Sequence, residues 1–413
     1  MIITDKAQIK CYELIESDLK LPADATFTRS SVAYLSDGTQ VDANTPRFEQ
    51  GKFGKAIMVE EGTTNLVNVA SWNPVKDDSY ETIIQTSEMI MGYPVYQATK
   101  KNTSTPPTTF YRLSIPNGAT FTASIYVNQL QVPVFEAACL IFYRGDLGTL
   151  AVVHAPKVTG WQRISVTYTN NKGMDLENVY VYFYPSRNTG EVTLFGAPQL
   201  EQKSYATSFI DSTRSAESLT IPTAGVLNPQ EGTVECWVYI DDRFINGMAS
   251  KYAWIWGTKG SPYYPILNLY RDGATKTLRF VSRDANNNQS YIGKLLSQIS
   301  VGWHYIACTW KSSRLAFLLD GQLVGEVVSP YLPNAVDAQM YIGHNPSVGE
   351  QCNSLIDDLR ISSRARTDAE ILAAYQSGEP LLADEWTAYM LDFDDKVRIT
   401  AQGQIICNEF IEI

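Results

Sequence analysis

The densest group of aromatic side chains in this sequence lies in a stretch that also contains Gly and Pro, residues 251–265. Its members are Tyr252, Trp254, Trp256, Tyr263 and Tyr264. Flat aromatic rings can stack on the apolar faces of sugars, and this is the chemistry that such a group offers. Alternate residues of a strand share one face, so Tyr252, Trp254 and Trp256 are expected to lie side by side. Aromatic residues mostly bury, so Trp254 and Trp256 could instead serve a hydrophobic core.

Two further features make the stretch a candidate contact for a glycan or a neighbouring subunit. Prolines flank Tyr263 and Tyr264 and stiffen the loop, which reduces the entropy lost on binding. Asn268 and Asp272 follow closely and could hydrogen-bond sugar hydroxyls. The predicted site therefore comprises Tyr252, Trp254, Tyr263, Tyr264, Asn268 and Asp272. One such site should bind weakly, with a Kd near ~1 mM, so useful adhesion needs many copies.

No set of catalytic residues is evident. The three histidines are not spaced as a metal-binding pair, and the sequence has no nucleophile elbow, phosphate loop or dinucleotide motif. A glycosidase needs two carboxylates facing each other across a sugar, about 5–10 Å apart. The acidic pairs Asp241-Asp242 and Asp357-Asp358 are neighbours whose side chains point to opposite faces of a strand. We predict that the protein is not an enzyme and has no certain cofactor.

The composition is that of a folded protein rich in strands. Of 413 residues, 44% are hydrophobic and 19% are charged, and the 24 Tyr and 8 Trp favour β-structure. The net charge is −11 and no run of five Lys or Arg occurs, so we expect no nucleic-acid partner. No stretch of about 18 apolar residues and no secretory signal pattern is seen, so we expect no membrane partner. The six scattered cysteines favour buried free thiols.

Short strand-like runs bounded by Gly, Pro or Asn predict an all-β fold of two β-sandwich domains in tandem. The expected parts are an N-terminal extended attachment segment (1–62), a first sandwich (63–210), a second sandwich (211–378) and a C-terminal tail with short strands (379–413). Asp320-Gly321 predicts a hairpin turn. One short helix is expected near 367–376, with a capping box of Thr367 and Glu370.

A Gly-Trp dipeptide opens a strand-like run in each half, at Gly160-Trp161 and at Gly302-Trp303. The echo indicates two sandwiches of related topology, although common strand composition could also produce it. We expect Trp161 and Trp303 to be buried in equivalent places. Replacement of either by Ala should then cost about 3–5 kcal/mol.

Several motifs follow one another in the second half in a characteristic order. They are Trp237-Val238, Gly302-Trp303-His304, Phe317 to Asp320-Gly321, Ile356-Asp357-Asp358-Leu359-Arg360-Ile361 and the 367–376 helix. Over roughly 150 residues this order resembles the laminin-G-like, concanavalin-A-like jelly rolls. The resemblance implies a jelly roll of lectin type, which sometimes holds a structural calcium. Asp357 and Asp358 are the candidate calcium ligands; their alternative role is a buried bridge to Arg360 or Arg364.

Residues 63–210 are similar to carbohydrate-binding-module-like sandwiches found in phage tail proteins. The Phe-Glu and Asp that often hold calcium in that family are not evident, and Ala197 stands near the expected Asp. The segments that frame this sandwich, 27–40, 46–66 and 200–222, resemble segments that recur in phage and prophage tail or virion proteins. This resemblance, and not the composition, implies a virion.

Three functions are compatible with these observations. The first is a non-enzymatic structural protein of a phage particle, on the tail, baseplate or capsid surface, assembled in the bacterial cytoplasm in many copies. It would contact other virion proteins and adhere to host cell-surface polysaccharide. The second is a carbohydrate-binding accessory module of a secreted polysaccharide-degrading system, and the third is a purely architectural spacer.

Overall fold

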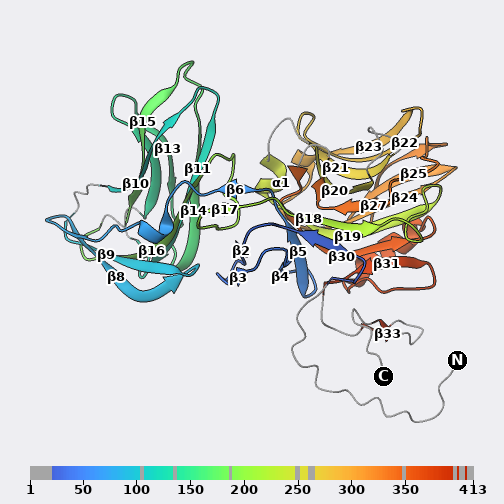
Figure 1. Ribbon diagram of the computed structural model, residues 1–413, viewed down its shortest axis with the longest axis horizontal. Helices are drawn as coiled ribbons and strands as arrows, with labels where there is room; N and C mark the ends of the chain where they lie inside the picture. Colours follow the sequence, from blue (N-terminus) through green and yellow to red (C-terminus); the bar gives the residue numbers. More distant parts are fainter. Residues whose placement is uncertain are drawn as a thin grey trace, which may run out of the picture.

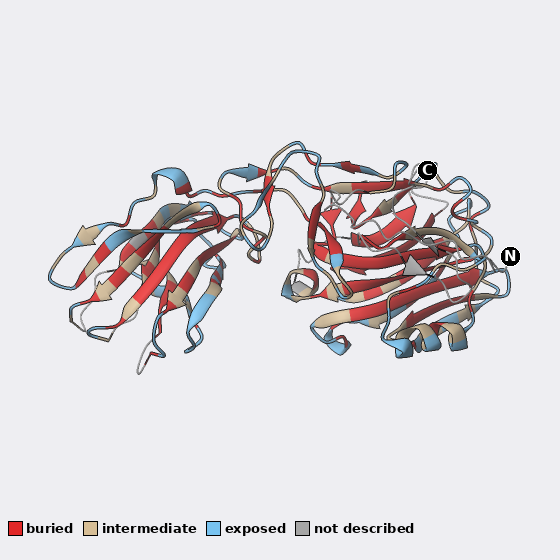
Figure 2. Cartoon of the chain, turned by 90° about the horizontal axis from the view of Figure 1, so that it is seen from below, coloured by how far each residue is buried: buried red, intermediate tan, exposed pale blue. Residues whose placement is uncertain are grey.

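The computed structural model describes residues 21–102, 107–133, 137–185, 188–246, 252–258, 266–346 and 350–393, together with the short strands β32 (Arg398–Ile399) and β33 (Ile405–Ile406). Within these residues the chain is an all-β protein of two β-sandwiches (Figure 1), which confirms the predicted fold class. Each sandwich encloses its own buried core (Figure 2). In the described part of the chain, no helix is long and apolar enough to cross a membrane.

The first sandwich consists of strands from the middle of the sequence. They are β7 (Lys76–Asp77), β8 (Glu81–Ile90), β9 (Tyr93–Lys100), β10 (Thr108–Ile115), β11 (Thr120–Gln129), β12 (Cys139–Arg144), β13 (Gly148–His154), β14 (Gly160–Thr169), β15 (Leu176–Tyr184) and β16 (Val192–Glu201). The β11 sheet has the order β14-β11-β16-β9-β8-β7, and the β15 sheet has the order β10-β15-β12-β13. Alternation along β11 and β15 directs Ile125, Val127, Val181 and Phe183 into the core between the sheets.

The second sandwich uses strands from both ends of the described chain. They are β1 (Thr26–Thr28), β4 (Arg47–Gln50), β5 (Lys55–Val59), β18 (Ser218–Pro222), β19 (Gly232–Ile240), β20 (Tyr252–Thr258), β21 (Ile266–Asp272), β22 (Thr277–Arg283), β23 (Gln289–Leu295), β24 (Gly302–Lys311), β25 (Arg314–Leu319), β26 (Gln322–Val328), β27 (Gln339–Ile342), β30 (Ser354–Ser362) and β31 (Thr387–Leu391). The β19 sheet has the order β26-β25-β24-β19-β30-β5-β4, with β31 beside β30. The β20 sheet has the order β1-β18-β27-β20-β21-β22-β23.

Short elements connect these strands. They are β2 (Ala33–Tyr34), β3 (Gln40–Val41), β6 (Thr63–Thr64), the 3₁₀ turn η1 (Val69–Ser71), β17 (Thr213–Arg214), helix α1 (Asp242–Asn246), the 3₁₀ turn η2 (Leu296–Gln298), β28 (His344–Asn345), β29 (Glu350–Gln351) and helix α2 (Asp368–Ser377). The predicted helix is confirmed as α2: Thr367 and Glu370 form its capping box, and Gly378 ends it with φ +67°. Asp320 and Gly321, with φ of +52° and +72°, form the predicted hairpin turn between β25 and β26.

The N-terminal segment is part of the second sandwich, unlike the separate attachment segment that the sequence predicted for residues 1–62. Strand β1 pairs with β18, and β5 pairs with β30 on one side and β4 on the other. The C-terminal tail likewise contributes β31, which pairs with β30. The first sandwich is therefore inserted between two pieces of the second. This arrangement was not visible in the sequence because strand pairing over such separations depends on the tertiary fold.

Buried ion pairs join the segments that frame the first sandwich. The charged residues are Arg29, Arg47, Glu60, Arg214, Glu217 and Arg243. Arg47 Nη2 lies 2.9 Å from Glu60 and 2.7 Å from Glu217, and Arg214 Nη2 lies 3.0 Å from Glu60, all with fully buried side chains. Burial opposes the ionisation of Glu60, but Arg214 and Arg47 hold its pKa below the usual range. The network gives a physical reason for the charged residues in the framing segments, because each segment supplies buried charges that residues of the other segments neutralise.

The two sandwiches share a three-strand unit in the same register. In the first, β11 lies between β14 and β16; in the second, β19 lies between β24 and β30. Ser124 lies opposite Ser165 and Gln199, and Glu235 lies opposite Ala307 and Arg360. A β-bulge follows in both units, with Ala197 and Asp358 each at φ +48°.

The register also places Trp161 and Trp303 at equivalent positions, because they face Asn128 and Tyr239 at the same distance from the bulge. Burial of Trp161, however, was predicted wrongly: its side chain is 39% exposed. On β14 the side chains of Ile164, Val166 and Tyr168 point into the core. Because side chains alternate along a strand, that of Trp161 points away from the core. The side chain of Trp303 also points away from the core between the sheets. It is partly buried because other residues cover that face of the β19 sheet. The repeated Gly-Trp dipeptide therefore occupies equivalent positions in the two sandwiches, but these positions are not in the core.

Candidate functional site

The outer face of the β20 sheet carries rows of aromatic and polar side chains. Paired residues on antiparallel strands point to the same side, so register defines each row. One row contains Tyr252, Asp272 and Thr277; the next contains Trp254, Tyr270 and Arg279; a third contains Tyr341, Gly257, Asn268, Val281 and Tyr291. Tyr252 and Tyr291 are 45% and 53% exposed, so the face presents two accessible rings.

A buried aromatic layer supports Tyr252. The rings of Tyr252 and Tyr270 meet edge to face with centroids 5.5 Å apart. The ring of Trp254 lies over Gly257, where an added Cβ would come within 2.6 Å of a ring carbon. Gly257 thus makes room for the indole, and Trp254 is left only 6% exposed. Trp254 belongs to the supporting layer, and Tyr252 is the ring available to a ligand.

Arg279 connects Asp272 with Tyr291. Its Nη1 lies 3.0 Å from Asp272 Oδ2, and its guanidinium lies 5.2 Å from the centroid of the Tyr291 ring. The other carboxylate oxygen of Asp272 accepts hydrogen bonds from the backbone N–H groups of Ala274 and Thr275. Asp272 therefore stabilises the turn that follows β21 and forms an ion pair with Arg279. Its negative charge is neutralised by a residue of the same face.

Asn268 is a polar residue beneath this surface. It is 3% exposed, and its Oδ1 accepts no hydrogen bond from the described residues. An unsatisfied buried amide oxygen costs about 1–3 kcal/mol, so such an atom demands an explanation. A Cβ atom added to Gly257 would come within 2.8 Å of Asn268 Cβ and within 2.6 Å of a carbon of the Trp254 ring, so Asn268 and Trp254 both lie next to Gly257.

The predicted site residues thus divide into three groups. Tyr252 lies at the surface, whereas Trp254, Asn268 and Asp272 lie in the layer directly below it. Tyr263 and Tyr264 lie outside the described residues. The prediction that Trp256 shares a face with Tyr252 and Trp254 was wrong. A β-bulge between Trp254 and Trp256 turns Trp256 inward, where it is fully buried 5.8 Å from Phe280.

Asp357 and Asp358, the candidate calcium ligands, are fully buried and bind backbone groups from two different segments. Asp357 Oδ2 accepts hydrogen bonds from the N–H groups of Lys52 and Phe53, and Asp358 Oδ2 accepts one from Leu381. Among the described residues, no three His, Cys, Asp or Glu side chains gather as a metal site would require. Calcium binding stays a prediction, with structural roles now assigned to the two carboxylates.

The two buried histidines have structural partners. His304 Nδ1 lies 2.8 Å from Asp320 Oδ2, and Nε2 lies 2.8 Å from the carbonyl oxygen of Ser300. Burial lowers the pKa of His304, but these hydrogen bonds and the charge of Asp320 outweigh it and raise the pKa. Burial alone lowers the pKa of His344 to about 4. The ring of His344 meets that of Tyr341, a residue of the third row, edge to face with centroids 5.3 Å apart.

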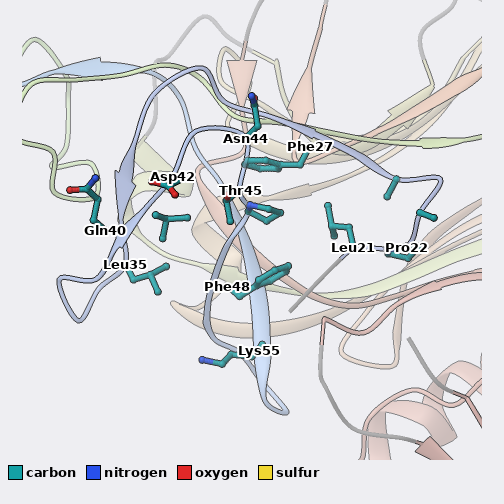
Figure 3. A pocket seen from close by; sticks show the side chains of 14 residues that line it. Leu21, Pro22, Phe27, Leu35, Gln40, Asp42, Asn44, Thr45, Phe48 and Lys55 are labelled. Atoms are coloured by element: carbon teal, nitrogen blue, oxygen red, sulfur yellow. The ribbon is translucent and has the colours of Figure 1, made fainter. Parts of the chain in front are cut away.

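A cavity of about 850 Å³ lies at the edge of the second sandwich (Figure 3). Phe27 of β1 and Phe48 of β4 line it from the edge strands of the two sheets, and Leu21 and Leu35 complete its apolar wall. Asp42 and Lys55 are its charged lining residues. A glycosidase needs two carboxylates, whereas this cavity is lined by one carboxylate and one ammonium group. The cavity lies where the edge strands of the two sheets meet.

Sequence reasoning missed Tyr270, Arg279, Tyr291 and Tyr341, which complete the outer face. The signal was present: along Thr277–Leu295 the residues that pair with Tyr270 and Asn268 alternate with apolar core residues. Alternation alone, however, does not say which strand lies next to which. The face becomes apparent only when the five strands β27, β20, β21, β22 and β23 are placed side by side in register.

Known proteins are similar to this chain in part. Residues 213–372 match the family model described as the concanavalin A-like lectin/glucanases superfamily, Laminin_G_3. No curated protein sequence matches the chain. Among solved structures, the receptor-binding domain of botulinum neurotoxin mosaic serotype C/D is 15% identical, with a TM-score of 0.33, over 39% of this chain and 40% of the other.

Two further structures extend the comparison. The heptameric SAP-like pentraxin of Limulus polyphemus is 11% identical, with a TM-score of 0.28, over 61% of this chain and 82% of the other. Domain 4 of AbnA, an extracellular arabinanase of Geobacillus stearothermophilus, solved with arabinotriose, is 16% identical, with a TM-score of 0.32, over 42% and 81%. The chain spans less than half of the neurotoxin domain it matches. The matched residues 213–372 contain strands β18 to β30 of the second sandwich, so the similarity to the concanavalin A-like lectin/glucanases superfamily is confined to that part of the chain.

Proposed function

We propose that this protein is a non-enzymatic carbohydrate-binding protein whose second sandwich binds a neutral glycan on the outer face of the β20 sheet. The observation that carries the proposal is the pair of exposed rings, Tyr252 and Tyr291, held over a buried polar and aromatic layer. Rings of this kind stack on sugars, and the charge of Arg279 is already neutralised by Asp272. The face therefore favours uncharged sugars.

The geometry also supports a binding role over hydrolysis. The rows on this face contain one carboxylate, Asp272, and glycoside hydrolysis uses two. Asp272 is occupied by Arg279 and by two backbone N–H groups. It cannot act as a general acid or nucleophile without losing the turn that it holds. We expect no release of reducing ends from polysaccharides by the pure protein.

The biological setting that we propose is a bacteriophage particle. Support comes from the resemblance of the framing segments to virion proteins and from their role here, where they form a buried network between the two sandwiches. On a particle, many copies would turn a weak site into useful adhesion to host polysaccharide. A purely architectural spacer would share the fold and the network but bind no sugar.

Isothermal titration of the full chain with neutral tetrasaccharides of glucose, galactose and mannose tests the proposal. We expect at least one to bind with a Kd near ~1 mM. A Tyr291→Ala variant should weaken this binding about tenfold, which corresponds to about 1.4 kcal/mol, because one of the two exposed rings is lost. Tyr80→Ala provides a matched control, because Tyr80 is 37% exposed in the other sandwich. If neither the protein nor its variants bind any of these sugars, the architectural role is favoured.

A further inference from the structure

The first sandwich carries an aromatic face of its own on the β15 sheet. Val179, Val181 and Phe183 point into the core, so Tyr180, Tyr182 and Tyr184 share the outer face, where each is partly exposed. Tyr180 and Tyr182 stack with centroids 5.4 Å apart, and Tyr143 of β12 lies 5.6 Å from Tyr182. Burial and the three neighbouring tyrosines together raise the pKa of Tyr182. We name Tyr143, Tyr180, Tyr182 and Tyr184 the tyrosine ladder.

One end of the ladder holds a fixed cation. The guanidinium of Arg112 lies 5.6 Å from the centroid of the Tyr180 ring. Its Nε donates a hydrogen bond of 3.1 Å to Asn178 Oδ1, and Nη2 donates to the same oxygen. Asn178 sits at φ +57°, where the pairing of β10 with β15 is irregular, and this geometry directs its amide to the arginine. Arg112 is exposed, so its remaining N–H donors face solvent.

The charge of Arg112 distinguishes this face from that of the β20 sheet. Arg279 is paired with Asp272, whereas Arg112 forms no ion pair with any carboxylate of the described residues. The first sandwich, residues 63–210, contains ten Lys and Arg and ten Asp and Glu, so its net charge is zero. The whole −11 of the protein therefore resides elsewhere. An anionic ligand meets no general repulsion at the ladder, and a carboxylate would complete Arg112 in a charge-assisted pair.

We propose that the tyrosine ladder is a second binding face and that its ligand is an acidic glycan, a chain of sugars with at least one carboxylate. The rings along β15 contact successive sugars, with Tyr180 and Tyr182 stacked and Tyr184 edge to face with Tyr182 at 6.4 Å between centroids. Arg112 binds the carboxylate at the Tyr180 end. The phenol hydroxyls and His154, which is exposed two strands away, offer hydrogen-bond partners to sugar hydroxyls. The inference does not depend on the neutral-glycan site of the second sandwich, because the ladder lies on a sheet of the other domain (Figure 1).

The test compares tetragalacturonate with its neutral, carboxyl-reduced counterpart by isothermal titration of the full chain. We expect the acidic tetramer to bind with a Kd near ~1 mM and the neutral one several-fold more weakly. Tyr182→Ala should weaken binding of the acidic tetramer about tenfold, which corresponds to about 1.4 kcal/mol, whereas Tyr182→Phe, which keeps the ring, should retain binding. Arg112→Gln should remove the preference for the acid while leaving the neutral tetramer bound as before. Rising salt should reduce the preference of the unaltered protein.

Control variants separate this face from the other. Tyr291→Ala and Tyr80→Ala should leave the binding of tetragalacturonate unchanged, and Lys157→Ala, which removes an exposed charge from the same sandwich, should do the same. Loss of binding in Tyr291→Ala would overturn the proposal, because it would assign the acidic glycan to the β20 sheet. The proposal would also be overturned if the Arg112→Gln variant kept the preference for the acidic tetramer. The same holds if a correctly folded Tyr182→Ala variant bound tetragalacturonate as tightly as the unaltered protein. The absence of binding to either tetramer would overturn it as well.

Discussion

The central residue of the shared three-strand unit is uncharged in the first sandwich, where it is Ser124, and charged in the second, where it is Glu235. Ser124 of β11 accepts a hydrogen bond of 2.9 Å from Arg163 beneath the segment that follows β16. At the equivalent position, Glu235 of β19 accepts a bond of 2.7 Å from Arg360 and one from Tyr305. The segment after β30, including α2, covers this second centre, and Arg366 lies 3.3 Å from Glu235.

The difference shows how one backbone arrangement accepts two kinds of buried chemistry. A hydroxyl group can be removed with the loss of one hydrogen bond, whereas a buried carboxylate that neutralises arginines cannot be removed alone. The second sandwich therefore depends on the chain that covers it far more than the first does. Three pairs of substitutions, with one member in each sandwich, test this comparison, beginning with the two central residues themselves.

Glu235→Ala should cause the largest loss of stability. It would leave Arg360 and Arg366 buried without their shared carboxylate, and removal of one partner of a buried pair costs about 3–5 kcal/mol. Ser124→Ala at the equivalent position should cost only about 1 kcal/mol. Urea-induced unfolding followed by circular dichroism measures both. Equal losses in the two variants would contradict the distinction between a charged and an uncharged centre.

Acid should destabilise the second sandwich through His344. Because burial lowers its pKa to about 4, the unfolded chain takes up a proton below about pH 6.5 while the folded chain does not. The stability that depends on neutral His344 is thus fully present above about pH 6.5 and lost as the pH falls towards 4, by up to about 3 kcal/mol. The raised pKa of His304 has the opposite sign: its contribution is present below its unfolded pKa and lost as the pH rises through the folded value.

The check is the free energy of unfolding from pH 7.5 to 4.5 for the unaltered protein and for His344→Gln. Part of the acid-induced loss should disappear in the variant, since glutamine does not titrate. The matched control is His154→Gln in the first sandwich, where the histidine is exposed. An identical pH dependence in all three proteins would show that His344 does not control acid stability.

The equivalent tryptophans should give the smallest difference. Trp303 is partly buried, 5.5 Å from Tyr239 in the covered face of the β19 sheet, so Trp303→Ala should cost about 2–3 kcal/mol. Trp161 is 39% exposed, and Trp161→Ala should cost about 1 kcal/mol or less. Thermal unfolding of the two variants gives the comparison. A larger loss at Trp161 would mean that its outward phase does not decide its contribution.

Local signals in the sequence were sufficient for the helix, the Asp320-Gly321 hairpin and the all-β class. Each depends on residues within one turn or one strand: Thr367 and Glu370 cap the same helix end, and Asp320 and Gly321 adopt positive φ in the same turn. Buried free thiols were also predicted: Cys236, Cys308 and Cys352 are free and buried, and Cys139 is buried. Binding at the candidate site stays a prediction: of its residues, Tyr252 is exposed, whereas Trp254, Asn268 and Asp272 are buried.

The sequence by itself determined the strand-rich fold, the capped helix and an aromatic group on β20, because these follow from local propensity and from period-two alternation. Only the tertiary structure decided that β1, β4 and β5 complete the second sandwich and that Glu60 and Glu217 are buried among arginines. It also decided that Trp256 turns inward and that the tyrosine ladder lies open on the β15 sheet. The physical reason is common to all of these: burial and charge neutralisation depend on which strands and segments become neighbours, and that is set by pairing across the whole chain.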